Sequence, residues 1–318
     1  MQNRWNDQEA AAFIGELQQR VYTSRLLGRD PSLVLHGGGN TSVKLTGTDI
    51  FGALQELLYV KGSGWDLEHI DVPGFAPVQL THLLKLAQLP ALSDPQMVNE
   101  LKTHMTDAGA PTPSVEAILH ALLPFKYVDH THADAIIAIT NTANGLARIK
   151  SIYADTVVII PYIMPGFDLA RLCALEFAKQ RTANTIGMVL MNHGIFSFGD
   201  TARESYTRMI DLVSRTEDYL QHQQAWDIPT IPSSIAADPL RQDIAAFRKQ
   251  LAELIGYPVI LQTRRMHRHR VLSSARTLPV FRSKGPPRRI MSFALSDCRY
   301  WVGISLVMPH TTKIISTR

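Results

Sequence analysis

Apolar residues in the first part of the chain follow a helical period and then a strand period. From Asp7, an N-cap type of residue, apolar positions at three- and four-residue spacing predict one helix that ends near Leu27 and Gly28. Short strand-like runs come next at 33–35, 42–45 and 57–60, separated by glycine-rich turns. Such runs favour an antiparallel meander over a parallel βαβ unit.

Further along, helical and strand-like segments are mixed. Helices are predicted at 77–89 and 94–105, from Ser114 onward, and at 168–181 and 201–226, and strands at 127–131, 156–160 and 188–192. We find no internal repeat. The pattern predicts an α/β body.

Composition changes this picture in one respect, the distribution of charge. The 318 residues, 45% of them hydrophobic, suit a globular enzyme-sized protein, and the formal net charge is +4. The stretch 263–318 holds twelve basic residues and one acidic residue, net +11, which leaves −7 for residues 1–262. The body therefore has no basic footprint for nucleic acid.

The chain also lacks the features of a secreted or membrane protein. No apolar run reaches membrane-spanning length, Cys173 and Cys298 are far apart, and the first residues contain no apolar signal core. We expect a soluble, cytoplasmic protein without a membrane partner.

Three histidines are candidate metal ligands. His130 and His132 are two apart near the end of a predicted strand, so both imidazoles fall on one face. His193 ends another apolar strand, and Gly194 lets the backbone turn close to a bound ion. Three nitrogens would leave one position open, as in catalytic zinc sites. Histidines of structural turns and strands are the alternative.

Glu116 and His120 are one turn apart on the helix predicted from Ser114. The positive end of the helix dipole would lower the pKa of Glu116, whereas burial beside an apolar pocket would raise it. The alternative to a chemical role is that Glu116 caps the helix N-terminus and His120 is an ordinary helix-face residue.

Two glycine-rich segments suit an anion. In 36–42 consecutive glycines, among them Gly39, expose amides, and Asn40 and Ser42 add polar side chains. The segment Lys61-Gly62-Ser63-Gly64 contributes a cation and a hydroxyl after the next strand. Neither has the spacing of a nucleotide-binding loop, and ordinary hairpin turns are the alternative.

Together these segments resemble the class II aldolase/adducin family, above all the aldolase half of bifunctional rhamnulose-phosphate aldolase/short-chain dehydrogenases. The matching segments keep their order and spacing and lie at 36–44, 61–67, 112–124, 128–134, 161–168 and 192–196. The resemblance covers about residues 8–262 and implies an α/β/α architecture around a central, mainly antiparallel sheet.

The resemblance also assigns roles to single residues. His130, His132 and His193 match the ligands of one zinc ion per subunit, and Glu116 matches the catalytic acid/base. The positions that bind the substrate phosphate match Asn40, Ser63, Gly64 and Ser114. Val115 departs from the pattern, because small sugar-phosphate aldolases commonly have a second phosphate-binding serine there. Tyr153 is the only candidate for a tyrosine that some members lend to a neighbouring subunit.

The implied activity is that of an aldehyde-lyase in carbohydrate metabolism. The reaction would be retro-aldol cleavage of a phosphorylated ketose to dihydroxyacetone phosphate and an aldehyde. Rhamnulose 1-phosphate, from rhamnose catabolism, is the expected type of substrate. The resemblance also implies a homotetramer. Alternatives are a non-catalytic, adducin-like binding module and an aldolase for another ketose or sugar acid. An oxidoreductase would need a dinucleotide-binding fingerprint, and none occurs in these 318 residues.

The basic stretch 263–318 forms a second predicted region. No Asp or Glu occurs between Glu253 and Asp297, and the arginines of 264–270 lack the periodicity of a packed element. Back-translation of 274–298 in another frame can give a sequence that resembles the segment after the aldolase domain in the bifunctional relatives. We therefore expect a frame-shifted, poorly ordered tail without a role in the metal site; a basic interaction arm is the alternative.

Overall fold

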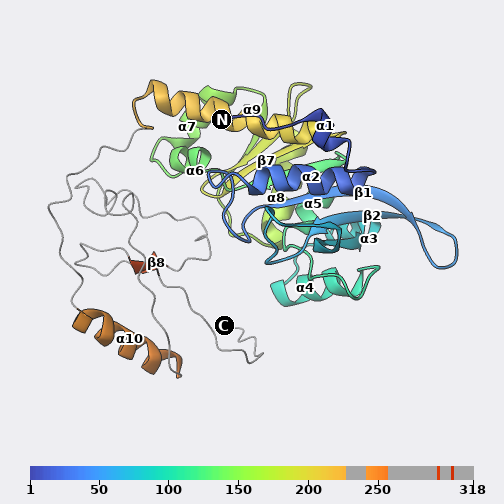
Figure 1. Cartoon of the computed structure of the whole chain (residues 1–318), viewed down its shortest axis with the longest axis horizontal. Helices are drawn as coiled ribbons and strands as arrows, with labels where there is room; N and C mark the ends of the chain where they lie inside the picture. Colours follow the sequence, from blue (N-terminus) through green and yellow to red (C-terminus); the bar gives the residue numbers. More distant parts are fainter. Residues whose placement is uncertain (227–240, 257–291, 294–301, 304–318) are drawn as a thin grey trace. The chain divides into compact units, whose positions relative to one another are not determined.

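The computed structural model describes residues 1–226, 241–256, 292–293 and 302–303 (Figure 1). The chain divides into a body, Met1–Trp226, and a second unit that contains helix α10 (Arg241–Ile255). In that unit β8 (Ser292–Phe293) pairs antiparallel with β9 (Val302–Gly303). The predicted boundary at residue 262, and the predicted frame-shifted tail apart from β8 and β9, lie outside the described residues.

A seven-stranded sheet forms the centre of the described body, in the order β3-β2-β1-β4-β7-β6-β5. Neighbouring strands are antiparallel except β5 and β6, which confirms the predicted mainly antiparallel sheet. The strands are β1 (Asn40–Thr48), β2 (Leu54–Lys61), β3 (Phe75–Gln79), β4 (Tyr127–Thr131), β5 (Val157–Ile160), β6 (Gly187–Leu190) and β7 (Gly194–Gly199).

Helices cover both faces of this sheet, so the predicted α/β/α architecture is also confirmed. Apolar residues of the first layer pack in one core; its helices are α1 (Asp7–Ala10), α2 (Glu16–Gly28), α6 (Asp134–Thr140), α7 (Gly145–Tyr153) and α9 (Ala202–His222). The second layer packs in another core; its helices are α3 (Leu80–Leu86), α4 (Asp94–Thr103), α5 (Ala117–Leu122) and α8 (Phe167–Gln180).

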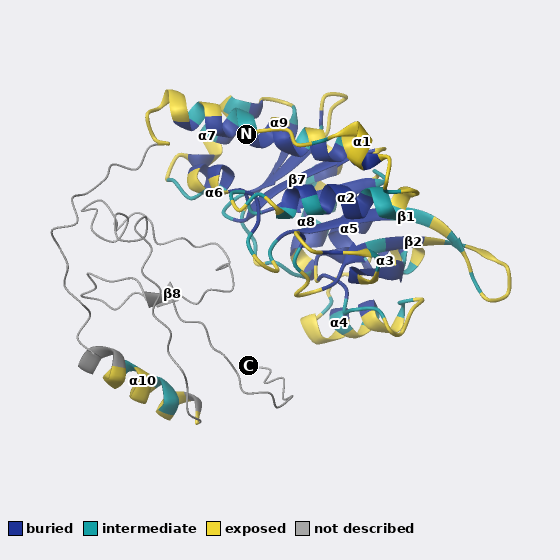
Figure 2. Cartoon of the chain, viewed as in Figure 1, coloured by how far each residue is buried: buried dark blue, intermediate teal, exposed yellow. Residues whose placement is uncertain are grey.

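Strand alternation divides the residues between these two cores. In β5, Val157 and Ile159 pack in the first core, whereas Val158 and Ile160 pack in the second. Because successive side chains of a strand point to opposite faces, a strand covered on both sides is apolar throughout. The sheet is accordingly buried between the helices in Figure 2.

Several predicted elements differ from the observed ones. The first predicted helix is two helices, because Gly15 lies between them in a left-handed conformation (φ +90°) and Asn6, not Asp7, caps the first. Residues 33–35 form a turn region. The helix expected from Pro77 starts at Leu80, because Pro77 belongs to edge strand β3, where a missing N–H is tolerated. The sequence analysis also missed β7, α6, α7 and the 3-10 turn η1 (Val72–Gly74).

No helix among the described residues is long and apolar enough to cross a bilayer.

A buried ion pair joins α2, β4 and α9 behind the strand that carries His130. The Arg20 Nη2 lies 2.5 Å from Asp129 Oδ1, and neither side chain is exposed. Asp129 Oδ2 accepts a hydrogen bond of 2.5 Å from the Ser205 hydroxyl. Burial raises the pKa of Asp129, while the charge of Arg20 and the Ser205 hydrogen bond act against this rise.

We expect Asp129→Asn to lower the free energy of unfolding by about 3–5 kcal/mol, because the Arg20 charge would stay buried without its partner. Urea unfolding measures this. The matched control is Asp211→Asn, which removes the exposed pair Asp211–Arg215 (2.7 Å) and should cost no more than about 1 kcal/mol. Equal losses in the two variants would contradict the importance of the buried pair.

Candidate metal centre and acid–base site

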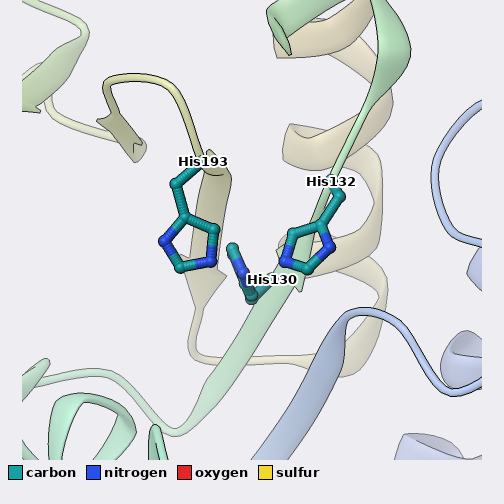
Figure 3. Close-up of side chains that lie close together, drawn as sticks. All are labelled: His130, His132 and His193. Carbon is teal, nitrogen blue, oxygen red and sulfur yellow. The ribbon is translucent and has the colours of Figure 1, made fainter. Parts of the chain in front are cut away.

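The three predicted metal ligands come together from two places in the sheet. His130 lies in β4, His132 is the first residue after β4, and His193 lies in the turn between β6 and β7. One candidate ligand atom from each residue lies within 4.8 Å of the other two. Figure 3 shows the three rings turned toward one another.

His130 is held in a fixed orientation. Its Nδ1 lies 3.1 Å from the Ile195 carbonyl oxygen, an acceptor, so Nδ1 carries the proton and Nε2 keeps its lone pair. The ring stacks on Phe196, with centroids 4.2 Å apart, and is completely buried. Burial, followed by the nearby His193, lowers the pKa of His130 well below its ordinary value. A neutral imidazole with a free lone pair is the form that binds a metal.

The turn that carries His193 requires two special backbone positions. Asn192 has φ +59°, and its side chain donates to the Thr140 carbonyl (3.1 Å) and to Asn141 Oδ1 (2.7 Å). A Cβ on Gly194 would lie 2.3 Å from the Thr131 carbonyl oxygen and 3.0 Å from His130 Cε1. Glycine therefore lets the turn approach β4 closely enough to bring His193 to the other histidines.

Glu116 lies at the N-cap of α5 and faces this cluster. Its Oε1 is 3.6 Å from His193 Nε2, and its Oε2 is 3.6 Å from His130 Nε2, both too long for hydrogen bonds. The Glu116 side chain makes no capping hydrogen bond to α5, so the alternative role as a helix cap is not observed. The carboxylate is directed at the histidines instead.

A chain of hydrogen bonds orients the Glu116 carboxylate. Asn40 Nδ2 donates to Glu116 Oε2 (2.6 Å) and to Ser114 Oγ (3.1 Å). His120 Nε2 donates to Asn40 Oδ1, and the Ser42 hydroxyl donates to His120 Nδ1 (2.8 Å). These directions are set by Glu116, because an ionised carboxylate only accepts. Burial lowers the pKa of His120 to about 3, so the ring is neutral in this chain.

The cluster has the buried, unpaired atoms expected of a metal site. Among the described residues, His130 Nε2, His193 Nδ1 and Glu116 Oε1 are buried without a hydrogen-bond partner. Leaving such groups unpaired costs about 1–3 kcal/mol each, so native structures rarely keep several together without a ligand. The donor set, imidazole nitrogens beside a carboxylate, suits a divalent transition metal.

The predicted phosphate segments also lie close together. Gly62 pairs with Pro113, and the Ser63 amide donates to the Thr112 carbonyl (2.8 Å), so the loop after β2 lies beside Ser114. Lys61 Nζ donates to the Gly37 carbonyl (3.0 Å) and so links this loop to the glycines before β1. Gly39 has φ +63°, and a Cβ there would lie 2.8 Å from the His130 carbonyl oxygen.

An open cavity of about 440 Å³ borders this region. Ser63 and Gly64 line it together with Trp65, Asp66 and His69. The three clustered histidines are not among its lining residues. The Asp66 carboxylate would repel an anion there, whereas the Ser63 hydroxyl would bind one.

Comparison with known proteins gives the family. Residues 18–220 match the model of the family described as "Class II Aldolase and Adducin N-terminal domain". The chain belongs to this family.

A solved structure of a relative agrees in fold. The structure is similar to the N-terminal class II aldolase domain of a conserved Thermoplasma acidophilum protein, with 44% identity, a TM-score of 0.64, and coverage of 69% of this chain and 99% of that one. L-Fuculose-1-phosphate aldolase from Thermus thermophilus is 16% identical, with a TM-score of 0.41 and coverage of 65% and 96%, a similarity too low to support an argument.

A third relative is much longer than the matched region. "Uncharacterized oxidoreductase YuxG" of Bacillus subtilis strain 168 is 36% identical over 216 residues, which are 68% of this chain and 31% of that protein. The chain thus spans about a third of this relative, and what the rest of that protein does is not transferred to it.

Within this class II aldolase fold, some predicted site residues lie beneath the surface. Ser42 is fully buried against His120, and Lys61 is buried beneath the glycine loop, where its Nζ also donates to the Trp65 carbonyl (2.6 Å). Ser42 thus supports the residues that orient Glu116, and Lys61 supports the loop that lines the cavity. Tyr153 is not a catalytic tyrosine, because it is buried in the first core and its hydroxyl donates to the Leu212 carbonyl (2.6 Å).

Two supporting residues were not recognised from the sequence. His120 was a candidate only for a helix-face role, yet it holds Asn40. Lys44 Nζ donates to three carbonyls at the end of α5, those of His120 (3.0 Å), Leu123 (2.5 Å) and Phe125 (2.7 Å). The sequence did contain one signal for these contacts. Polar residues occupy alternate positions in 40–44, and alternate positions of a strand share a face.

We expect Gly194→Ala to reduce metal content by more than half, because the new Cβ would push the His193 turn away from β4. Elemental analysis of the purified variant measures this. Gly109→Ala is the control, since a Cβ there meets only the Asp107 side chain at 3.3 Å. Unchanged metal content in Gly194→Ala would show that the close approach is not required.

Proposed function

We propose that this chain is a zinc-dependent class II aldolase that cleaves a phosphorylated ketose by retro-aldol chemistry. The observation that carries the proposal is the convergence of His130, His132 and His193 on the Glu116 carboxylate in a largely buried site. A non-catalytic adducin-like module would not require the buried nitrogens without hydrogen-bond partners on His130 and His193 or the carboxylate that faces them.

The metal would be held by the three histidines, one ion per subunit. Neutral nitrogen donors with one position left for substrate suit zinc in its catalytic role. When bound, the ion would withdraw electron density from the ketose oxygens and so favour breakage of the C3–C4 bond.

Glu116 would move the proton in this reaction. Its carboxylate lies beside the histidines, and Asn40 holds it in one orientation through a 2.6 Å hydrogen bond. His120 keeps Asn40 from rotating, because the neutral ring donates to the Asn40 oxygen. A fixed base 3.6 Å from the metal-ligand nitrogens can reach a hydroxyl of a substrate placed between them.

The substrate phosphate would bind where the glycine loop, Ser63, Gly64 and Ser114 meet. Support comes from the packing of the three segments around Lys61 and from the adjoining cavity. Asp66 in the cavity and Val115 beside Ser114 are the features that favour the second candidate, an aldolase acting on another ketose or on a sugar acid. Rhamnulose 1-phosphate, giving dihydroxyacetone phosphate and lactaldehyde, remains the first substrate to test.

We also propose a homotetramer. The support in the described body is the tip of the β1–β2 hairpin, which extends from the body in Figure 1 and exposes Ile50, Phe51 and Leu54. Exposed apolar groups of this size commonly mark a protein contact. Light scattering measures the assembly, and a monomer would contradict the proposal.

We expect Glu116→Gln to lower turnover by at least about a hundredfold while leaving metal content unchanged, because the amide cannot accept the proton. Coupled assays of aldehyde release and elemental analysis measure the two quantities. Glu176→Gln, a change on the surface of α8, is the control and should retain full activity. Full activity in Glu116→Gln would remove Glu116 from the mechanism.

We expect zinc-loaded protein to cleave at least one ketose 1-phosphate, and chelator treatment to abolish the activity until zinc is restored. The assay compares a panel of ketose 1-phosphates with the same ketoses lacking phosphate and with sugar acids. Faster cleavage of the phosphate-free compounds would replace the phosphate proposal by the second candidate. No cleavage by metal-loaded protein of any compound would favour the binding module.

A further inference from the structure

A second group of metal-ligating side chains lies away from the aldolase site, between α3 and α4. His82 lies on α3, Glu100 lies on α4, and His104 is the residue that caps the C-terminus of α4. One candidate ligand atom from each of these residues lies within 4.8 Å of the other two. The described residues contain only this group and the three catalytic-site histidines with such an arrangement.

The Glu100 carboxylate lies beside both rings. Its Oε2 is 2.9 Å from His82 Nε2 and 3.6 Å from His104 Nδ1. Donors around a tetrahedral zinc ion with bonds of roughly 2.0–2.1 Å lie about 3.4 Å apart, so the Glu100 carboxylate and the His82 Nε2 are close enough to share one ion. All three side chains are partly exposed, which gives an ion access from solvent.

His104 has the hydrogen bond typical of a metal ligand. Its Nδ1 donates to the Glu100 carbonyl (2.9 Å), so Nε2 keeps the lone pair. The same arrangement orients His130 in the catalytic site.

The backbone beneath the group is fixed on both sides. The Gln79 amide donates to the His104 carbonyl (3.0 Å), and Met105 pairs with Val78 of β3. The end of α4 is thereby fastened to the strand from which α3 starts. Leu83 and Leu101 pack in the same core, so the helices that carry the donors cannot separate without exposing it.

The two imidazoles stack, with centroids 3.2 Å apart and planes at 6°. Lone pairs of parallel rings do not converge on one point, so binding requires the rings to tilt apart about their side-chain torsions. Two neutral rings and one carboxylate then supply two nitrogens and one oxygen, a set that suits zinc or a similar transition metal.

We propose that His82, Glu100 and His104 bind a second divalent transition-metal ion, such as zinc, that ties α3 to α4. The fourth position would hold water, and the ion would have no part in the aldol chemistry. Because α3 and α5 share one core, the tie would stabilise the layer that carries Glu116.

The test counts zinc in the full-length protein after chelator treatment, exposure to excess Zn²⁺ and removal of free ion. His82→Gln and His104→Ala should each contain one equivalent less than wild type and should lose part of the zinc-dependent rise in melting temperature. Cleavage activity should stay within about twofold, which separates this proposal from the aldolase proposal.

His222→Ala is the matched control. His222 also ends a helix and places Nδ1 2.6 Å from the carbonyl oxygen four residues earlier, that of Asp218, but it belongs to no ligand group of the described residues. It should retain the wild-type zinc count. Circular dichroism verifies that each variant is folded. The Glu100→Gln variant is a third protein that lacks one of the proposed ligands. The proposal is overturned if these three variants keep the wild-type zinc content. It is also overturned if the wild-type protein binds only one equivalent of zinc and His130→Ala eliminates it.

Discussion

The pairing of Arg20 with Asp129 is the constraint on which the site depends. Both groups are fully buried, and Asp129 directly precedes His130 in β4. Because neighbouring residues of a strand face opposite sides, the ion pair anchors the face of β4 toward α2 and α9 while His130 faces α5. A charged pair in a core adds little stability by itself, but it penalises any other position of the strand, since displacement would leave a charge alone.

The opposite face of β4, which carries His130, has a different kind of polar contact. Around Glu116 the supporting groups are neutral: His120, Asn40, Ser42 and Ser114 form hydrogen bonds without adding a charge. A charged partner would neutralise the carboxylate or compete for the metal. Neutral donors fix its direction and leave its charge for the ion and the substrate. The face of β4 toward α2 and α9 therefore holds a charged pair, whereas the face toward Glu116 holds neutral hydrogen-bonding groups.

The sequence predicted the class of the fold, and it pointed to three histidines that the structure brings together. The spacing of His130 and His132 and the glycine after His193 are local signals, so the sequence alone could single out these three candidate ligands. The strand β7 was missed because Gly194–Gly199 begins and ends with glycine, and β3 because Pro77 resembles a helix start. The roles of Ser42, Lys61 and His120 depend on contacts between residues 24 to 80 positions apart, which no local pattern contains. Family resemblance supplied the residue assignments that the spacing left open.

The three histidines differ in how firmly their backbone is held. His130 pairs with Asn40 on one side and with Phe196 on the other, whereas His193 lies in a tight turn that depends on Asn192 and Gly194. Ligand atoms on a rigid backbone fix the distances to a bound ion. A ligand atom on a turn determines how quickly the ion can leave. In the proposed metal site, the rate at which the ion exchanges would therefore depend on the Asn192 side chain and its hydrogen bonds to the end of α6.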